Sequence, residues 1–256
     1  TTFNSRKKYI YLCYPKIQND MKHEKENIKI GTHECIIFSP KKILTDNKPT
    51  EILFLQPVDS HDVEELEKEI TYIEAHISSH FIFVAIRITK WNEELTPWGV
   101  PPIFGKTPFG EGASNTLLYI KEQLLPYLLR RFYENYRPKI ILGGYSLAGL
   151  FTLWTSYNTD FFNGIVSASP SIWYKDWLEY AEQNTPKVKF AYLSLGDKED
   201  HTKTKIISTV KECMAKQIEI YQTQGVNVKF DWNEGNHFQD NGERTAKGFV
   251  HVASSL

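Results

Sequence analysis

Hydrophobic residues along the chain fall into two patterns, short continuous runs and stripes with a helical period. The run Phe81-Ile-Phe-Val-Ala-Ile is rich in β-branched and aromatic residues, as is typical of a strand buried on both faces. Between positions 63 and 77, apolar residues instead recur every three or four positions, which predicts one buried face of a helix. Runs and stripes alternate along the chain, which indicates parallel βαβ units.

We therefore predict an open, twisted, mostly parallel sheet with helices on both faces, in three layers. No internal repeat or long linker divides the chain, so residues 1–256 are expected to form a single domain. The first two strands are expected to pair as a hairpin, Pro57 to end the third strand and Pro126 to kink its helix. Predicted strands cover residues 8–14, 35–38, 52–55, 81–86, 139–142, 164–168, 189–195 and 226–232. Predicted helices cover residues 63–77, 117–132, 147–157, 177–182 and 206–222, and a terminal helix begins near Arg244.

The segment 91–113 is the longest irregular stretch between predicted elements, because it contains four prolines and four glycines. Ligands of open α/β sheets bind beyond the carboxyl ends of the strands, which is where this segment starts. Its aromatic residues argue against disorder and leave two interpretations, a packed surface flap or an active-site loop that forms the wall of an apolar substrate pocket. The second interpretation makes Trp98 and Phe104 candidate substrate-binding residues.

Composition narrows the function classes. The chain is 41% hydrophobic and 24% charged, with a formal net charge of -1, so it lacks the basic excess that nucleic-acid or anionic-membrane binding needs. Its three cysteines form neither a disulfide framework nor a zinc-binding pattern, which favours a reducing compartment. No apolar run reaches the roughly 20 residues of a membrane helix, and no signal-type apolar core follows the polar amino terminus. We expect a cytoplasmic protein.

One serine lies where a predicted strand runs directly into a predicted helix, in the sequence Gly143-Gly-Tyr-Ser-Leu-Ala-Gly149. Gly144 and Ala148 supply the small residues that the tight turn of a nucleophile elbow requires around Ser146. The turn would expose the Ser146 hydroxyl at a helix amino terminus, where the N–H of Leu147 could stabilise an oxyanion. The alternative interpretation is that Ser146 is only a helix N-cap.

A serine hydroxyl needs a base to take its proton. Of the eight histidines, His237 follows the last predicted strand, in a glycine-containing loop at the same sheet edge. An α/β-hydrolase places its base there, after the serine and the acid in chain order. The alternative is a loop histidine without a role.

The acid is expected after the strand 189–195, where three carboxylates follow one glycine. Such an acid holds the imidazole in its useful tautomer. Glu199 is our first choice, Asp200 the second and Asp197 the third, although a solvated charged turn would have a similar sequence.

From Glu51 to its carboxyl terminus the chain resembles an esterase family of the α/β-hydrolase superfamily. The family includes esterase D, also called S-formylglutathione hydrolase, and the enterochelin-type siderophore esterases. Besides the serine turn, the resemblance rests on four segments. They are Ser167-Ala-Ser-Pro-Ser171 followed by Trp173, Leu193-Ser-Leu-Gly-Asp-Lys-Glu199, Gly235-Asn-His-Phe238, and Leu95-Thr-Pro-Trp98 with Pro101-Pro102.

The resemblance implies an α/β-hydrolase fold with Ser146 as nucleophile, Glu199 as acid and His237 as base. It also places Ser169, with its neighbours Pro170 and Ser171, beside the cleft, and we add Tyr145 to the candidate substrate-binding residues. The family's second oxyanion donor usually comes from a glycine-containing turn. Here the turn contains Pro57, which has no N–H, so we assign the donor to Val58.

We therefore predict a serine esterase that cleaves a small-molecule carboxylic ester through an acyl-enzyme, without a metal or organic cofactor, as a monomer or homodimer. Two alternatives remain. The same residues could cleave a thioester or a siderophore lactone, or the chain could be a catalytically silent binding module.

Overall fold

The computed structural model describes residues 21–41, 51–103, 105–133 and 136–256. Within them, eight strands form one sheet in the order β1-β2-β4-β3-β5-β6-β7-β8. The strands from β4 to β8 in this order are parallel, whereas β2 pairs with both of its neighbours in antiparallel fashion. The mostly parallel sheet that the sequence predicts is confirmed.

The helices and strands have the following bounds. The strands are β1 (His23–Ile30), β2 (His33–Pro40), β3 (Ile52–Val58), β4 (Phe81–Arg87), β5 (Lys139–Tyr145), β6 (Gly164–Ala168), β7 (Phe190–Gly196) and β8 (Asn227–Asn233). The helices are α1 (Ser60–His76), α2 (Trp91–Glu94), α3 (Ala113–Tyr119), α4 (Leu125–Phe132), α5 (Leu147–Asn158), α6 (Trp177–Gln183), α7 (Val210–Thr223) and α8 (Asn241–Ser255). A π-helical turn, η2 (Ile120–Leu124), joins α3 to α4, and a 3₁₀ turn, η3 (Ile207–Thr209), precedes α7.

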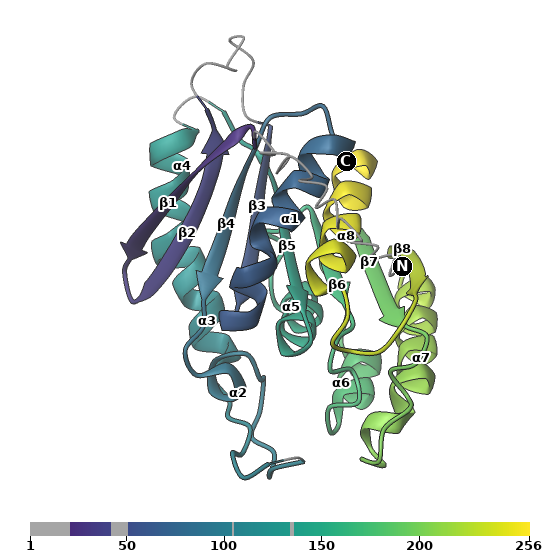
Figure 1. The fold of residues 1–256 in the computed structure, drawn as a ribbon. Coiled ribbons are helices and arrows are strands. Elements are labelled where there is room, and N and C mark those ends of the chain that lie inside the picture. Colours follow the sequence, from purple (N-terminus) through teal and green to yellow (C-terminus); the bar gives the residue numbers. More distant parts are fainter. Residues whose placement is uncertain (1–20, 42–50, 104, 134–135) are drawn as a thin grey trace, which may run out of the picture.

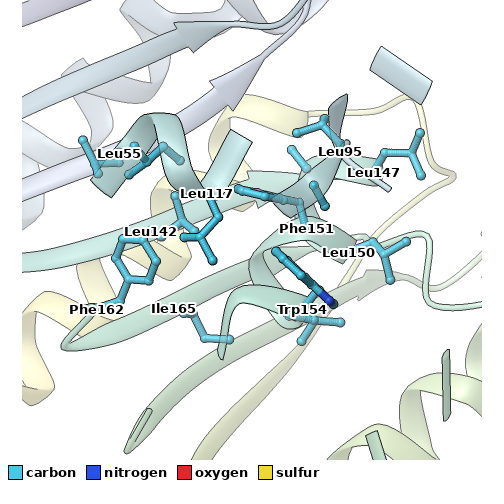
Figure 2. Close-up of a cluster of buried hydrophobic side chains, with 14 of the residues drawn as sticks. Leu55, Leu95, Leu117, Leu142, Leu147, Leu150, Phe151, Trp154, Phe162 and Ile165 are labelled. Atoms are coloured by element: carbon cyan, nitrogen blue, oxygen red, sulfur yellow. The ribbon is translucent and has the colours of Figure 1, made fainter. Parts of the chain in front are cut away.

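Helices cover both faces of the sheet, which gives three layers (Figure 1). Side chains alternate between the faces, so Phe54 of β3 packs with Phe249 of α8, while Leu53 and Leu55 belong to the opposite core. Helices α1 and α8 cover the first face, and α3 to α7 cover the second. Figure 2 shows part of the second core, around the buried helix α5. The α/β-hydrolase fold and its three layers agree with the prediction.

The largest difference from the predicted elements is β1. The sequence predicts the hairpin partner of β2 at residues 8–14, which lie outside the described residues, whereas the structure pairs β2 with β1. Strand β1 lies at an edge of the sheet and buries only His23 and Ile30, so it shows no apolar run. An edge strand of this composition carries a weak sequence signal.

Two prolines act differently from expectation. Pro57 does not end β3, which pairs with β4 as far as Val58, but pairing with β5 stops at Leu55. A proline cannot donate to a ladder, so its effect falls on one side of the strand. Before Pro126 the helix widens into the π turn η2, because proline lacks the N–H that a regular helix would use.

Smaller corrections concern element boundaries. The segment 91–113 is not wholly irregular, since it contains α2 and a bridge between Val100 and Phe109. The regular part of α7 begins at Val210, after η3, and α8 begins at Asn241, one turn before Arg244. In the described part of the chain, no helix combines the length and the apolar character needed to cross a membrane.

Candidate active site

The turn at Ser146 has the geometry of a nucleophile elbow. Ser146 lies between β5 and α5 with φ 57° and ψ -120°, a strained conformation for a residue other than glycine. A Cβ atom on Gly144 would overlap the carbonyl oxygen of Ala148, so only glycine fits there. The strain and the close approach lift the Ser146 side chain to the carboxyl edge of the sheet, where it stays partly accessible.

Ser146, His237 and Glu199 come together at that edge, although they lie far apart in the sequence. The Ser146 Oγ is 3.0 Å from Nε2 of His237, and Nδ1 of the same ring is 2.9 Å from Oε2 of Glu199. The imidazole thus contacts a hydroxyl on one side and a carboxylate on the other. This arrangement can transfer a proton from Ser146 to His237.

Glu199 is the acid that the structure places against His237. Its carboxylate is buried, and burial alone would raise its pKa, yet hydrogen bonds from His237, Ser169 and the Gly196 N–H together hold the pKa below its usual value. The side chain therefore stays ionised at neutral pH. A Cβ on Gly196 would lie 2.9 Å from Glu199 Oε1, which explains the glycine before this turn.

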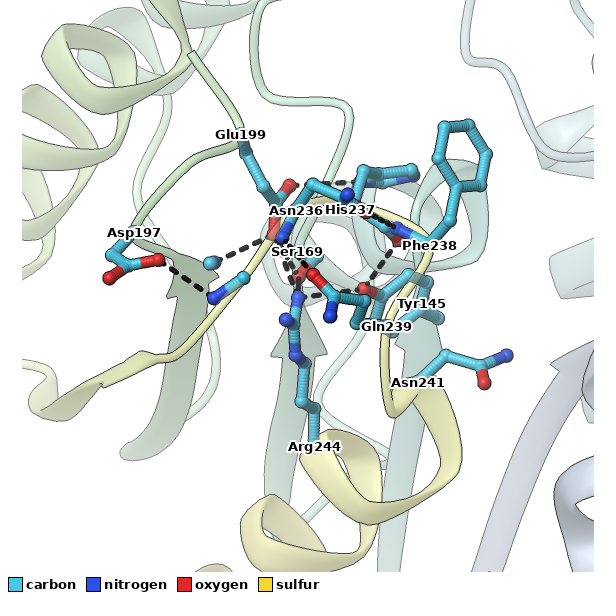
Figure 3. Close-up of polar contacts among 12 residues, drawn as sticks. Tyr145, Ser169, Asp197, Glu199, Asn236, His237, Phe238, Gln239, Asn241 and Arg244 are labelled. Atoms are coloured by element: carbon cyan, nitrogen blue, oxygen red, sulfur yellow. Dashed lines mark hydrogen bonds and ion pairs between the residues drawn. The ribbon is translucent and has the colours of Figure 1, made fainter. Parts of the chain in front are cut away.

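The other two carboxylates of this turn point elsewhere. Asp200 Oδ1 lies 2.8 Å from the ammonium of Lys211, and the ion pair lowers its pKa. Asp197 accepts a hydrogen bond of 2.7 Å from the N–H of Gly235 and so ties the acid turn to the loop that carries His237 (Figure 3).

The two oxyanion candidates have different surroundings. Leu147 is the first residue of α5, so its N–H has no acceptor earlier in the helix and lies at the positive end of the helix dipole. Val58 is fully buried at the end of β3, and the lining of the cleft at Ser146 starts with the next residue, Asp59. The N–H of Asp59 is directed at the Asp62 carboxylate, 3.3 Å away. The assignment of Val58 stays a prediction.

A cleft of about 200 Å³ opens in front of Ser146 and His237. Besides these two residues, the cleft is lined by aromatic side chains and by polar side chains at the start of α1 and α8. Its lining includes Tyr145, Trp91 and Phe238, and Asp59, His61, Asp62 and Asn241. A second cavity of about 1030 Å³ shares Asp59 and Trp91 with the cleft.

The candidate substrate-binding residues are dispersed. Trp98 packs on Tyr174 and Tyr180 and donates a hydrogen bond to the Lys175 carbonyl, so it anchors the segment 91–113 and lines neither of these two cavities. Phe104 lies outside the described residues. Ser169 is fully buried behind the acid and donates a 2.6 Å hydrogen bond to Glu199.

Tyr145 lines the cleft, but its hydroxyl donates a hydrogen bond of 2.9 Å to the His237 carbonyl. Burial raises the pKa of this phenol well above its usual value, so it remains a donor at neutral pH.

Several residues of this site were not predicted from the sequence, among them Arg244, Phe238 and the cleft-lining Asp59, Asp62 and Asn241. Arg244 is 1% exposed and lies against Glu199, but it belongs to a helix, and nothing in a helical pattern singles out one arginine. Phe238 is 82% exposed beside His237, and its ring meets the imidazole edge-on with centroids 5.3 Å apart. The only signal for Phe238 was its place next to the candidate base.

Comparison with known proteins identifies the family of the chain. The family described as "Putative esterase" matches residues 33–241, which is most of the sequence. The chain belongs to this esterase family. No curated protein matches it significantly.

Solved structures agree with this fold. Siderophore hydrolase EstB from Aspergillus nidulans is similar with a TM-score of 0.70 at 18% identity, covering 90% of the esterase and 95% of EstB. An IroE-like serine hydrolase from Shewanella oneidensis has a TM-score of 0.67 at 15% identity, with 90% and 79% covered. Enterobactin and salmochelin hydrolase IroE has a TM-score of 0.62 at 14% identity, with 90% and 94% covered.

Family membership makes the protein a carboxylic ester hydrolase. Identities this low show the fold alone and not the substrate.

Phe238 is expected to contact the acyl group of aromatic esters. The Phe238→Ala variant should raise KM for a benzoyl ester about 5- to 10-fold through lost apolar contact, and leave KM for the matching acetyl ester nearly unchanged. Steady-state kinetics on the two esters measure this. Trp232→Ala, which removes an exposed aromatic of β8 outside the cleft lining, is the matched control. Equal effects of Phe238→Ala on both esters would contradict the contact.

Asp62 is expected to make binding of cationic esters depend on pH. Burial and the nearby Asp59 raise the pKa of this carboxyl to about 6, so the Asp62 side chain is neutral below that pH and adds a negative charge to the cleft wall above it. The KM of an ester with a quaternary ammonium group, divided by that of its neutral isostere, should fall about 3- to 10-fold as pH rises through this range. A ratio that does not change with pH, or that changes equally in Asp62→Asn, refutes the expectation.

Proposed function

We propose that the esterase hydrolyses its ester through a covalent acyl-enzyme on Ser146, with His237 as general base and acid and Glu199 as the carboxylate that orients and stabilises the imidazole. The observation that carries this proposal is the unbroken series of contacts from Ser146 through His237 to Glu199 at the carboxyl edge of the sheet. Their order in the chain is that of an α/β-hydrolase triad.

In the first half of the reaction, Nε2 of His237 takes the Ser146 proton as Oγ attacks the carbonyl carbon of the ester. The N–H of Leu147 donates to the oxyanion that forms on the carbonyl oxygen. His237 then gives its proton to the departing alcohol oxygen, the carbon–oxygen bond breaks, and an acyl ester on Ser146 remains.

In the second half, His237 takes a proton from a water molecule that attacks the acyl carbon. The collapse of this second intermediate returns a proton from His237 to the Ser146 oxygen and releases the carboxylic acid. Throughout, the ionised Glu199 stabilises the imidazolium without accepting its proton.

A fluorophosphonate probe tests the activated serine directly. Wild-type protein should be labelled on the peptide that contains Ser146, and Ser146→Ala should not be labelled. If neither protein reacts and no ester of an acyl-chain panel is cleaved, the fold is a catalytically silent module and the proposal fails.

Hydrolysis of a large siderophore ester is a second candidate for the substrate. The cavity of about 1030 Å³ that adjoins the cleft supports a substrate much larger than a simple acetate, and solved structures with this fold are named as siderophore hydrolases. A panel with acyl p-nitrophenyl esters, formylglutathione and a catecholate trilactone distinguishes ester, thioester and lactone specificity. The cytoplasmic location and the monomeric or homodimeric state stay predictions.

A further inference from the structure

Arg244 of α8 is a buried cation next to Glu199, the proposed acid (Figure 3). Its Nη1 lies 3.1 Å from Oε1 of Glu199, and its Nη2 donates a hydrogen bond of 2.8 Å to the carbonyl of Glu234. The guanidinium therefore contacts both the turn that carries the acid and the loop that leads to His237.

The two oxygens of Glu199 have separate sets of partners. Oε2 accepts from the His237 ring, whereas Oε1 faces Arg244, Ser169 and the N–H of Gly196, all within 3.1 Å. Donors on Oε1 fix the rotation of the carboxylate and leave Oε2 directed at the imidazole. The position of Oε2, which contacts His237, thus depends on the donors that hold Oε1.

A second path joins Arg244 to His237. Nη1 of Arg244 also donates to the Tyr145 hydroxyl at 3.1 Å, and that hydroxyl donates to the His237 carbonyl. Tyr145 immediately precedes the nucleophile, so this path links the elbow to the histidine loop. One guanidinium contacts all three segments that carry the proposed triad.

Stability alone is a poor reason for this arrangement. Among the described residues, the Nε of Arg244 is buried without an acceptor, which costs desolvation free energy. Buried ion pairs are often no more stabilising than apolar residues of the same volume. A fixed positive charge next to Glu199 is better explained by a role in the chemistry of the site.

We propose that Arg244 is a positioning residue of the esterase, which fixes Glu199 and the His237 loop around Ser146 and, by balancing the charge of Glu199, keeps His237 available as a neutral base. This inference rests on the proposed function. An uncompensated carboxylate would favour the imidazolium, which cannot accept the Ser146 proton. Arg244 opposes this because its guanidinium stays protonated and neutralises Glu199 in a buried setting.

Other ionisable groups also face His237. The ring of Tyr145 contacts the His237 imidazole at a tilt, with centroids 5.3 Å apart. Asp59, His61 and Asp62 line the cleft from the start of α1. The carboxylate of Asp197 accepts a hydrogen bond from the Gly235 N–H of the loop. Because Asp62 changes charge near pH 6, each Arg244 variant is compared with wild type and also in an Asp62→Asn background.

The experiment measures kcat and KM for a p-nitrophenyl ester across weakly acidic to weakly alkaline pH. In Arg244→Met the acid limb of kcat/KM should move about one to two pH units upward, because proton uptake by the coupled Glu199–His237 pair becomes easier. Its kcat at the pH optimum should fall about 100-fold with misplacement of the triad. Arg244→Lys keeps the charge but not the fork, so its acid limb should stay in place while kcat falls about 10-fold with little change in KM.

Lys247→Met, one turn further along α8 at a residue that forms an ion pair with Glu243, is the matched control and should behave as wild type. A folded Arg244→Met protein, judged by circular dichroism, whose acid limb matches wild type overturns the inference. If Arg244→Met does not fold, Arg244→Lys decides, and a wild-type kcat in that variant also overturns it. A wild-type protein that neither cleaves esters nor reacts with the fluorophosphonate contradicts the proposed function itself, which is a different outcome.

Discussion

The Ser146→Ala variant should lose about 10⁶-fold in kcat, because no other described hydroxyl replaces the nucleophile at 3.0 Å from the His237 Nε2. Alanine removes the Oγ but keeps the Cβ, so the backbone strain at the elbow is the same as with serine. The fold should therefore persist, as judged by thermal unfolding, while burst and steady-state turnover of a p-nitrophenyl ester disappear.

Ser171→Ala is the matched control for this loss. Ser171 Oγ lies 3.5 Å from Ser146 Oγ and is buried, but it has no hydrogen bond to the histidine ring in the structure. Its removal should change kcat less than about 10-fold. If Ser171→Ala abolished turnover while Ser146→Ala retained it, the nucleophile would have been assigned to the wrong serine.

Glu199→Gln should lower kcat about 10⁴-fold with the fold intact. The amide has the shape of the carboxylate but cannot stabilise the imidazolium, and its NH₂ group facing Nδ1 favours the wrong tautomer. Stopped-flow acylation with an activated ester measures the loss in the step that uses the base. Ser169, Gly196 and Arg244 would still direct their donors at this position, so binding affinity should change little.

Asp197→Asn and Asp200→Asn separate the three neighbouring carboxylates. Asp200 pairs with Lys211, so Asp200→Asn should change kcat by less than about twofold. Asp197 contacts the Gly235 N–H, so Asp197→Asn should lower kcat only about 10-fold, because the loop that carries His237 is held less firmly. A larger loss in either variant than in Glu199→Gln would move the acid to that residue.

The sequence predicted the central sheet because its parallel strands are buried on both faces and appear as apolar runs. The edge strand β1 escaped prediction since six of its eight residues remain at least partly exposed. The effect of Pro57 was overestimated, because a missing N–H disturbs one ladder and leaves the other in place.

For the site, position after a strand was an effective guide. Ser146, Glu199 and His237 all follow strands of one parallel sheet, so the topology alone brings them to one edge. Trp98 anchors its loop through a hydrogen bond to the Lys175 carbonyl, and its role in substrate binding stays a prediction. Arg244 could not be found, since its importance lies in contacts to three segments that only the folded chain brings together.

The most direct test of the proposed proton transfer from Ser146 to His237 is rapid-quench mass spectrometry of the protein with a slowly deacylating ester. We expect one added acyl group, on the peptide that contains Ser146, which forms before product accumulates and is absent in His237→Ala. Product formation without any acyl adduct, or an adduct of equal rate in His237→Ala, would contradict the account.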